Sequence, residues 1–247
     1  MTERAGSVMG SWKTGTIAGL AGLAVGAAGV SAWYGSRAPD RAATEQIVRD
    51  YILNNGEILP EAMDRLQRRQ ASAAVGQYRA ALERPFHGAW AGAEDGDVVL
   101  VEFFDYACGY CRASNADVER LLREDPRLKV VWRDYPVLGP GSEQAAVASL
   151  AAARAGRFKA FHDALYAAGR PTEATVSATA RANGLGATAL TDEFRAELQR
   201  NFQLARAVGV SGTPTFVVGN RVLSGAVGYE ALRDAIREAR SSSSTRS

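Results

Sequence analysis

Two cysteines three residues apart, Cys108 and Cys111, most constrain this 247-residue chain, because it has no others. A β-branched and aromatic run at 98–104 precedes them, and apolar residues at helical spacing follow at 113–124. The pattern predicts a strand, a tight turn and a helix, with Cys108 at the helix N-terminus. Unpaired backbone N–H groups and the helix dipole favour a thiolate there. A Cys-x-x-Cys pair in this setting is typical of a thiol–disulfide active site.

Three other interpretations of the pair remain open. A zinc site would need two more ligands, and the two histidines, His87 and His162, lie far from the pair in sequence. A purely structural disulfide across three residues would close a very small ring and stabilise the fold little. Two buried, inert thiols are the third alternative. We expect a redox-active disulfide between Cys108 and Cys111, with no metal and no other cofactor.

The rest of the main domain, expected at 86–240, reads as an α/β fold. A second strand is predicted at 128–135, and strand–helix–strand order implies a parallel βαβ unit. A helical insertion follows at about 142–208, broken by glycines into several helices. Strand character returns at 215–223 around a Gly-Asn hairpin turn, and a last helix spans 229–240.

This order resembles the thioredoxin fold of the DsbA-like oxidoreductases, with an inserted helical subdomain. The matching segments within about 95–240 are 101–104, the Cys-Gly-Tyr-Cys centre, 156–166 and 209–216. In that family the proline of the last segment is cis and faces the cysteines, and Pro214 matches it. With residues 47–70 before this domain included, especially 58–63, the chain resembles the suppressor-of-copper-sensitivity protein C subgroup.

Each cysteine has an expected role. Cys108 lies nearer the helix start, so it is the expected nucleophile, and Cys111 is expected to resolve the mixed disulfide. Glu102 lies six residues before Cys108 in a run that should be buried. Burying a carboxyl there costs free energy, which indicates a function for it. It could accept or relay the Cys111 proton. The resemblance implies the same role, and a solvent-facing strand-edge glutamate is the alternative.

Substrate contacts are expected from Thr213, Pro214 and Tyr110. Pro214 has no N–H, so Thr213 can present its backbone to an extended substrate strand beside the cysteines; an ordinary trans turn is the alternative. Tyr110 lies between the cysteines, where residues tune thiolate stability. His162 falls in a family-matched position but is expected to serve helix packing.

The N-terminal segment 1–36 predicts the compartment. Arg4 and Lys13 precede an uncharged stretch at 14–36, as in an export signal. An uncleaved membrane anchor is the alternative, since about 20 apolar residues span a bilayer. Both interpretations place the remainder in the periplasm or another extracytoplasmic space, where disulfides persist.

A helical arm is expected at 37–85. Apolar stripes predict two small helices that Asn54, Asn55 and Gly56 separate, with Pro60 opening the second helix. Two such helices bury these stripes poorly against each other, so they must pack on the main domain or on copies of themselves. We favour a homo-oligomer formed through the arm. The serine-rich tail at 241–247 is expected to be disordered.

The sequence therefore predicts an exported thiol–disulfide oxidoreductase acting on unfolded or misfolded exported proteins, in concert with a membrane redox partner. The oligomeric arm favours an isomerase or reductase over a dithiol oxidase of the DsbA type. A protein that binds Cu(I) is an alternative of another class, because two thiolates suit this soft ion. A net charge of +2 without a basic run gives no sign of nucleic-acid binding.

Overall fold

The computed structural model describes residues 41–244, which divide into two compact units with the boundary between Ala62 and Met63. The predicted export signal or anchor at 1–36 lies outside the described residues. Among the residues that are described, no helix is both long enough and apolar enough to cross a membrane. The first unit contains α2 (Arg41–Asn54) and the start of α3 (Ile58–Glu83), and α2 has no buried residue.

The second unit is built on a five-stranded sheet in the order β1-β3-β2-β4-β5. The central strands β2 and β3 are parallel, as predicted, and the other three pairings are antiparallel. The strands are β1 (Trp90–Gly92), β2 (Val98–Phe104), β3 (Leu128–Asp134), β4 (Thr215–Val218) and β5 (Arg221–Ser224). The short edge strand β1 was not predicted, because three residues carry no alternation to detect.

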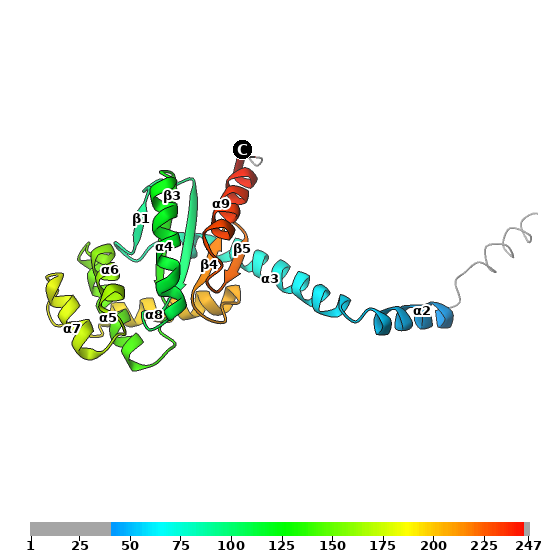
Figure 1. Ribbon diagram of the computed structural model, residues 1–247, viewed down its shortest axis with the longest axis horizontal. Coiled ribbons are helices and arrows are strands. Elements are labelled where there is room, and N and C mark those ends of the chain that lie inside the picture. Colours follow the sequence, from blue (N-terminus) through cyan, green and yellow to red (C-terminus); the bar gives the residue numbers. More distant parts are fainter. Residues whose placement is uncertain (1–40, 245–247) are drawn as a thin grey trace, which may run out of the picture. The chain divides into compact units, whose positions relative to one another are not determined.

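Six further helices complete this unit (Figure 1). Local signals set their ends: Thr172 caps α7 with its side chain, and α8 stops where Gly209 adopts a left-handed φ of 81°. The predicted helical insertion therefore comprises four helices. The six are α4 (Gly109–Glu124), α5 (Pro140–Arg154), α6 (Phe158–Ala168), α7 (Glu173–Ala182), α8 (Asp192–Val208) and α9 (Tyr229–Ser244).

Side chains of the central strands alternate between two buried cores, one on each face of the sheet. Leu100 and Phe104 of β2 join the core covered by α4, α6 and α9. Val101 and Phe103 join the opposite core, which α8 and the C-terminal part of α3 cover. Figure 1 shows α4 and α9 side by side over the sheet, and the two helices are in contact. Neighbouring residues of one strand thus serve different cores.

The C-terminal part of α3 belongs to the second unit, whose first residue is Met63 rather than the predicted 86. Val75 and Leu82 are each 1% exposed in the core beneath the sheet. Arg133 of β3 donates to the carbonyl oxygens of Ala81, Leu82 and Arg84, where the helix has no backbone donors left. The second predicted arm helix is therefore 26 residues long and is anchored to the sheet.

Helix α9 continues past the predicted end of order at 240. It extends to Ser244, because the hydroxyls of Ser241 and Ser242 donate to the Glu238 carbonyl oxygen within the last turns. The remainder of the predicted tail, 245–247, lies outside the described residues.

Candidate active site around Cys108 and Cys111

Cys108 occupies the N-cap position of α4, directly after a tight turn. Its backbone N–H donates to the Asp105 carbonyl oxygen at 3.0 Å, which closes that turn. Its Sγ accepts the Cys111 backbone N–H at 3.4 Å. A sulfur in this position meets the positive end of the helix dipole.

The two thiols are both free, and they differ in access. Cys108 is 6% exposed, whereas Cys111 is 0% exposed one turn further into the helix. Burial raises the pKa of the Cys111 thiol well above its usual range, and the nearby Glu102 charge raises it further. The Cys111 thiol therefore holds its proton at neutral pH, and it needs a base before it can act as a nucleophile.

Thr213 and Pro214 lie against Cys108 from the far end of the sequence. The peptide bond between them is cis, as the family resemblance implied. The Cys108 thiol donates to the Thr213 carbonyl oxygen at 3.2 Å. On either side, Thr215 Oγ1 donates to the Gly212 carbonyl oxygen at 2.7 Å and the Gly225 N–H donates to the Pro214 carbonyl oxygen at 2.8 Å. These bonds fix the loop that places Thr213 beside the outer thiol.

Glu102 lies at 0% exposure in the middle of β2, which contradicts the alternative of a solvent-facing glutamate. Its register partners are Trp132 on β3 and Phe216 on β4. The Trp132 indole N–H donates to Oε2 at 2.9 Å, while Oε1 is buried with no hydrogen-bond partner in the described part of the chain. Burial raises the pKa of Glu102 to about 8, against a smaller lowering by the Trp132 hydrogen bond.

Asp105 organises the turn, a role that the sequence analysis missed. Its Oδ1 accepts the Ala107 N–H at 2.8 Å, and its Oδ2 accepts the N–H groups of Val137 and Leu138 at 2.8 and 3.0 Å. Its carbonyl oxygen also accepts the Tyr166 hydroxyl at 3.0 Å. The sequence did contain a signal for this role, because Asp105 is an acidic residue directly after a buried strand. Asp105 thereby ties the cysteine turn to the loop that follows β3.

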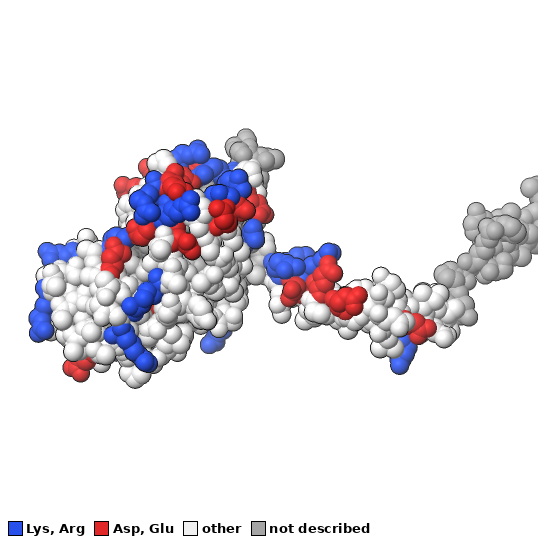
Figure 2. Space-filling model, in the orientation of Figure 1, with Lys and Arg blue, Asp and Glu red and all other residues white. Residues whose placement is uncertain are grey.

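Large apolar side chains are exposed in both the cysteine turn and the loop after β3. Tyr110 points outward at 71% exposure, and Val137 and Leu138 are 43% and 52% exposed. Figure 2 shows charged side chains of both signs intermingled at the end of the second unit where α9 finishes. There Arg240 pairs with Asp97 and Asp125 at 2.7 and 2.9 Å. The surface at the cysteine turn therefore combines these apolar side chains with the exposed guanidinium of Arg112, which directly follows Cys111.

His162 lies in a buried aromatic cluster on α6, consistent with a packing role. Its ring centroid is 5.1 Å from that of Phe104 and 5.3 Å from that of Trp132. Its Nδ1 lies 3.3 Å from the Tyr106 hydroxyl, which donates to Ser149 Oγ, which donates in turn to Asp134. Burial lowers the pKa of His162 to about 3, so the ring is neutral at physiological pH.

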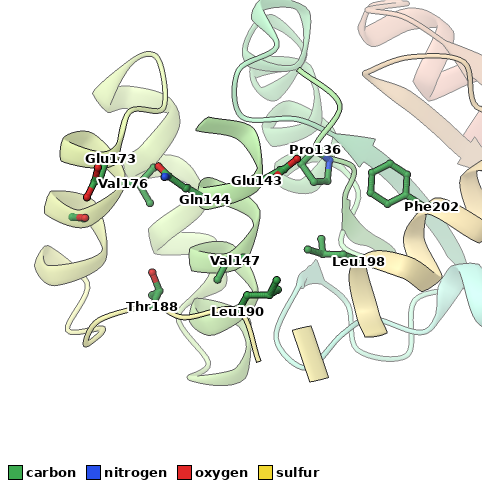
Figure 3. A pocket seen from close by; sticks show the side chains of 11 residues that line it. Pro136, Glu143, Gln144, Val147, Glu173, Val176, Thr188, Leu190, Leu198 and Phe202 are labelled. Atoms are coloured by element: carbon green, nitrogen blue, oxygen red, sulfur yellow. The ribbon is translucent and has the colours of Figure 1, made fainter. Parts of the chain in front are cut away.

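A hollow of about 510 Å³ lies in the helical insertion, and neither cysteine lines it. Figure 3 shows its lining side chains projecting from α5, α7, α8 and the segment before α8. It is therefore separate from the thiol site. Among the described residues, no group of three or more His, Cys, Asp or Glu side chains is arranged to hold a metal ion.

Comparison with known proteins places this geometry in a family. Residues 99–237 match the DSBA-like thioredoxin domain, and residues 40–73 match the N-terminal domain of the copper resistance protein ScsC. The chain spans about a quarter of the length of two curated relatives, the Na(+)/H(+) antiporters NhaA 3 of Salinispora tropica and NhaA 1 of Salinispora arenicola. It is 32% identical to the first over 162 residues, which are 60% of this chain and 24% of the antiporter.

Solved structures give the same assignment. A linker-deletion mutant of Proteus mirabilis ScsC superposes with a TM-score of 0.70 at 29% identity, covering 83% of this chain and 97% of that one. A periplasmic thioredoxin-like protein from Salmonella enterica serovar Typhimurium superposes with a TM-score of 0.62 at 28% identity, covering 67% and 97%. With a DSBA-like match over more than half its length and an ScsC-like arm before it, this chain belongs to the DsbA-like thioredoxin-domain family of thiol–disulfide oxidoreductases.

Proposed function

We propose that the chain is an exported protein-disulfide isomerase or reductase, in which Cys108 is the nucleophile and Cys111 the resolving thiol. The supporting observation is the contrast between the two thiols: Cys108 caps a helix and keeps 6% of its surface exposed, while Cys111 is fully buried near the Glu102 carboxyl. An accessible nucleophilic thiol and a buried thiol whose proton a neighbouring carboxylate can accept suit exchange with a protein disulfide.

The first step forms a mixed disulfide. The Cys108 thiolate attacks one sulfur of a substrate disulfide, so a bond forms between Cys108 and that sulfur while the other substrate sulfur leaves as a thiolate. An extended substrate segment would lie along the backbone of Thr213 and Pro214, with Tyr110 beside it. The carbonyl oxygen of Thr213, 3.2 Å from Sγ, would help to orient that segment.

Two outcomes follow from the mixed disulfide. In isomerisation, another substrate thiolate attacks its bonded sulfur and Cys108 leaves unchanged, so no net oxidation occurs. In reduction, Cys111 passes its proton to Glu102 and attacks Cys108; the substrate sulfur leaves as a thiolate and the two cysteines become a disulfide. An external dithiol, supplied by a membrane redox partner, must then reduce that disulfide.

The exposed arm supports isomerase over oxidase. Large apolar side chains are open to solvent along α2 and the N-terminal part of α3, which favours burial against a second copy of the chain. Several active sites in one assembly would re-engage a misfolded substrate faster than a monomer could, because tethering raises effective concentration. These side chains are Ile47, Val48, Tyr51, Leu53, Leu59, Met63 and Leu66.

The predicted compartment and partners are part of this proposal. The relative from Salmonella that is described as periplasmic supports an oxidising space outside the cytoplasm. Substrates would be exported proteins with wrong or incomplete disulfides.

The proposal is tested by pairing two activities with the mass of the assembly. We expect the chain from residue 37 onward to be an oligomer by light scattering and to reactivate scrambled ribonuclease, with Cys108→Ser inactive. The double substitution Ile47→Glu with Tyr51→Glu, on one face of α2, should give a monomer that still reduces insulin but no longer isomerises. The control Gln46→Glu adds charge to the same exposed helix and should change neither property. A monomeric unsubstituted chain would contradict the assembly, and an oligomer that reduces insulin without refolding ribonuclease would contradict isomerisation.

A further inference from the structure

We propose that Trp132 is a positioning residue for proton transfer from Cys111: its indole N–H holds one carboxylate oxygen of Glu102 and leaves the other free to receive the proton. This inference rests on the thiol–disulfide exchange proposed above. It adds a residue on β3 that contacts neither the reacting sulfurs nor the substrate.

The strand register builds the contact. Glu102 and Trp132 are direct partners in the parallel pairing of β2 with β3, so both side chains project from the same face of the sheet. The indole Nε1 donates to Oε2 at 2.9 Å, and Oε1 stays buried without a partner among the described residues. A buried oxygen without a donor is costly, and a proton arriving from Cys111 would satisfy it.

The indole is fixed in place from behind. Trp132 is 3% exposed, and its ring centroid lies 5.5 Å from Phe158 and 5.3 Å from His162. Packing on that side prevents the ring from rotating away from Glu102. Phe158 and His162 of α6 thus hold the Trp132 indole in the position from which it donates to Glu102.

The neutrality of the indole matters as much as its hydrogen bond. The titratable groups that face Glu102 are Cys111 on α4, Tyr106 in the turn and Tyr166 on α6, and His162 packs against the indole instead. The facing strand β4 contributes Phe216, and α9 contributes apolar residues to the same core. Among the described residues, no lysine or arginine lowers the pKa of this carboxyl, which stays at about 8. Glu102 can therefore take a proton and return it near neutral pH.

The step balances without a further reactant. The Cys111 S–H bond breaks and its proton passes to Oε1 of Glu102. The Cys111 sulfur then bonds to the Cys108 sulfur, and the substrate sulfur leaves the mixed disulfide as a thiolate. Trp132 exchanges no proton or electron, and its indole keeps Oε2 occupied throughout.

The test isolates this step with an aromatic disulfide that releases a coloured thiolate. Mixed with the reduced full chain in a stopped-flow instrument, it gives a first release at Cys108 that depends on reagent concentration. The second release, which Cys111 drives, is independent of that concentration. Its rate is measured against pH in the unsubstituted chain and in Trp132→Phe. Without the donor the ionised carboxylate is less stabilised, so the midpoint of the profile should move up by about one pH unit.

Controls separate positioning from damage. Trp90→Phe, a strand tryptophan in the opposite core, should leave the midpoint in place. In a Glu102→Gln background, Trp132→Phe should shift nothing further, because the two residues act through one carboxyl. If Trp132→Phe does not fold, replacing tryptophan biosynthetically with its benzothiophene analogue removes the N–H and keeps the ring shape, with the same shift expected.

Three results would count against the inference. An unchanged midpoint in Trp132→Phe overturns it, and so does an equal shift in Trp90→Phe. A shift that persists with Gln at position 102 shows that Trp132 acts by another route. Absence of the second release from the unsubstituted chain would instead overturn the proposed exchange chemistry itself.

Discussion

Two neighbouring residue pairs in the sheet show two ways of burying a charged group. Glu102 and Trp132 face the core under α4 and α9, while Phe103 and Arg133, the next pair along the same strands, face the core under α3 and α8. Arg133 has partners for its guanidinium donors in three carbonyl oxygens, Glu197 and Asn201. Glu102 has one donor and a vacant oxygen.

The difference in hydrogen bonding suits Arg133 to a structural role and Glu102 to proton transfer. A buried ion with all its hydrogen bonds made is held in one state, because any change of partner or protonation breaks several contacts. A buried carboxyl with only one of its oxygens hydrogen-bonded has a raised pKa, so it can gain or lose a proton near neutral pH at little cost in free energy. The face with the incomplete pair is also the face that carries the cysteines.

The largest effect is expected from removing the anchor. Arg133→Met should lower the free energy of unfolding by about 3–5 kcal/mol. It leaves the buried Glu197 carboxylate with Arg200 as its remaining cationic partner, and it removes the donors to the last carbonyl oxygens of α3. Urea denaturation followed by circular dichroism measures this loss. Arg133→Lys is the matched control: it keeps the charge but not the fork of donors, so its loss should be smaller. A loss below about 1 kcal/mol for Arg133→Met would show that the buried network contributes little.

Glu102→Gln should change the pH dependence of stability in the opposite sense to a salt bridge. The folded pKa of about 8 lies above the ordinary value of 4.5, so the native state binds the extra proton. Its stabilising contribution is complete below about pH 4.5 and is lost as pH rises toward 8. Between pH 5 and pH 7 the free energy of unfolding of the unsubstituted chain should therefore fall relative to the variant by about 2.5 kcal/mol.

The measurement compares urea midpoints of the two proteins at several pH values. The unsubstituted chain and the variant share Asp134, a second buried acid whose pKa burial raises, so part of the slope remains in both. A constant gap between them across this range would mean that Glu102 is ionised throughout.

The smallest effect tests the partner of the anchor. Glu197→Gln keeps an oxygen for Arg133, 3.2 Å away, but removes the opposing charge. It should cost about 1–2 kcal/mol of stability and leave the pH profile of insulin reduction unchanged, because Glu197 lies in the core beneath the other face. A shifted pH profile would show that the charge of Glu197 affects the titrating groups on the opposite face of the sheet.

Local patterns were enough to predict much of the fold. The strand at 98–104, the helix after the cysteines, the parallel second strand and the late hairpin all lie where hydrophobic spacing and turn residues place them. The positions of Cys108, Cys111, Thr213 and Pro214 followed from motifs at fixed offsets. These features depend on neighbours in the sequence.

The missed features depend on partners far apart in the sequence. Trp132 and Glu102 lie 30 residues apart, and only the strand register brings them together. Arg133 read as an ordinary strand residue, yet its partners lie 49 to 68 residues away. The partners of the last turns of α3 could not be predicted for the same reason, since these turns are stabilised by the sheet rather than by their own composition.

The unpaired oxygen of Glu102 also makes the stability of the fold and the rate of the Cys111 step respond to pH in opposite directions. Under the proposed mechanism, Glu102 activates Cys111 only when it lacks the proton that stabilises the fold. In an acidified surrounding the molecule should persist but work slowly, and in an alkaline one it should work quickly while resisting proteolysis less well.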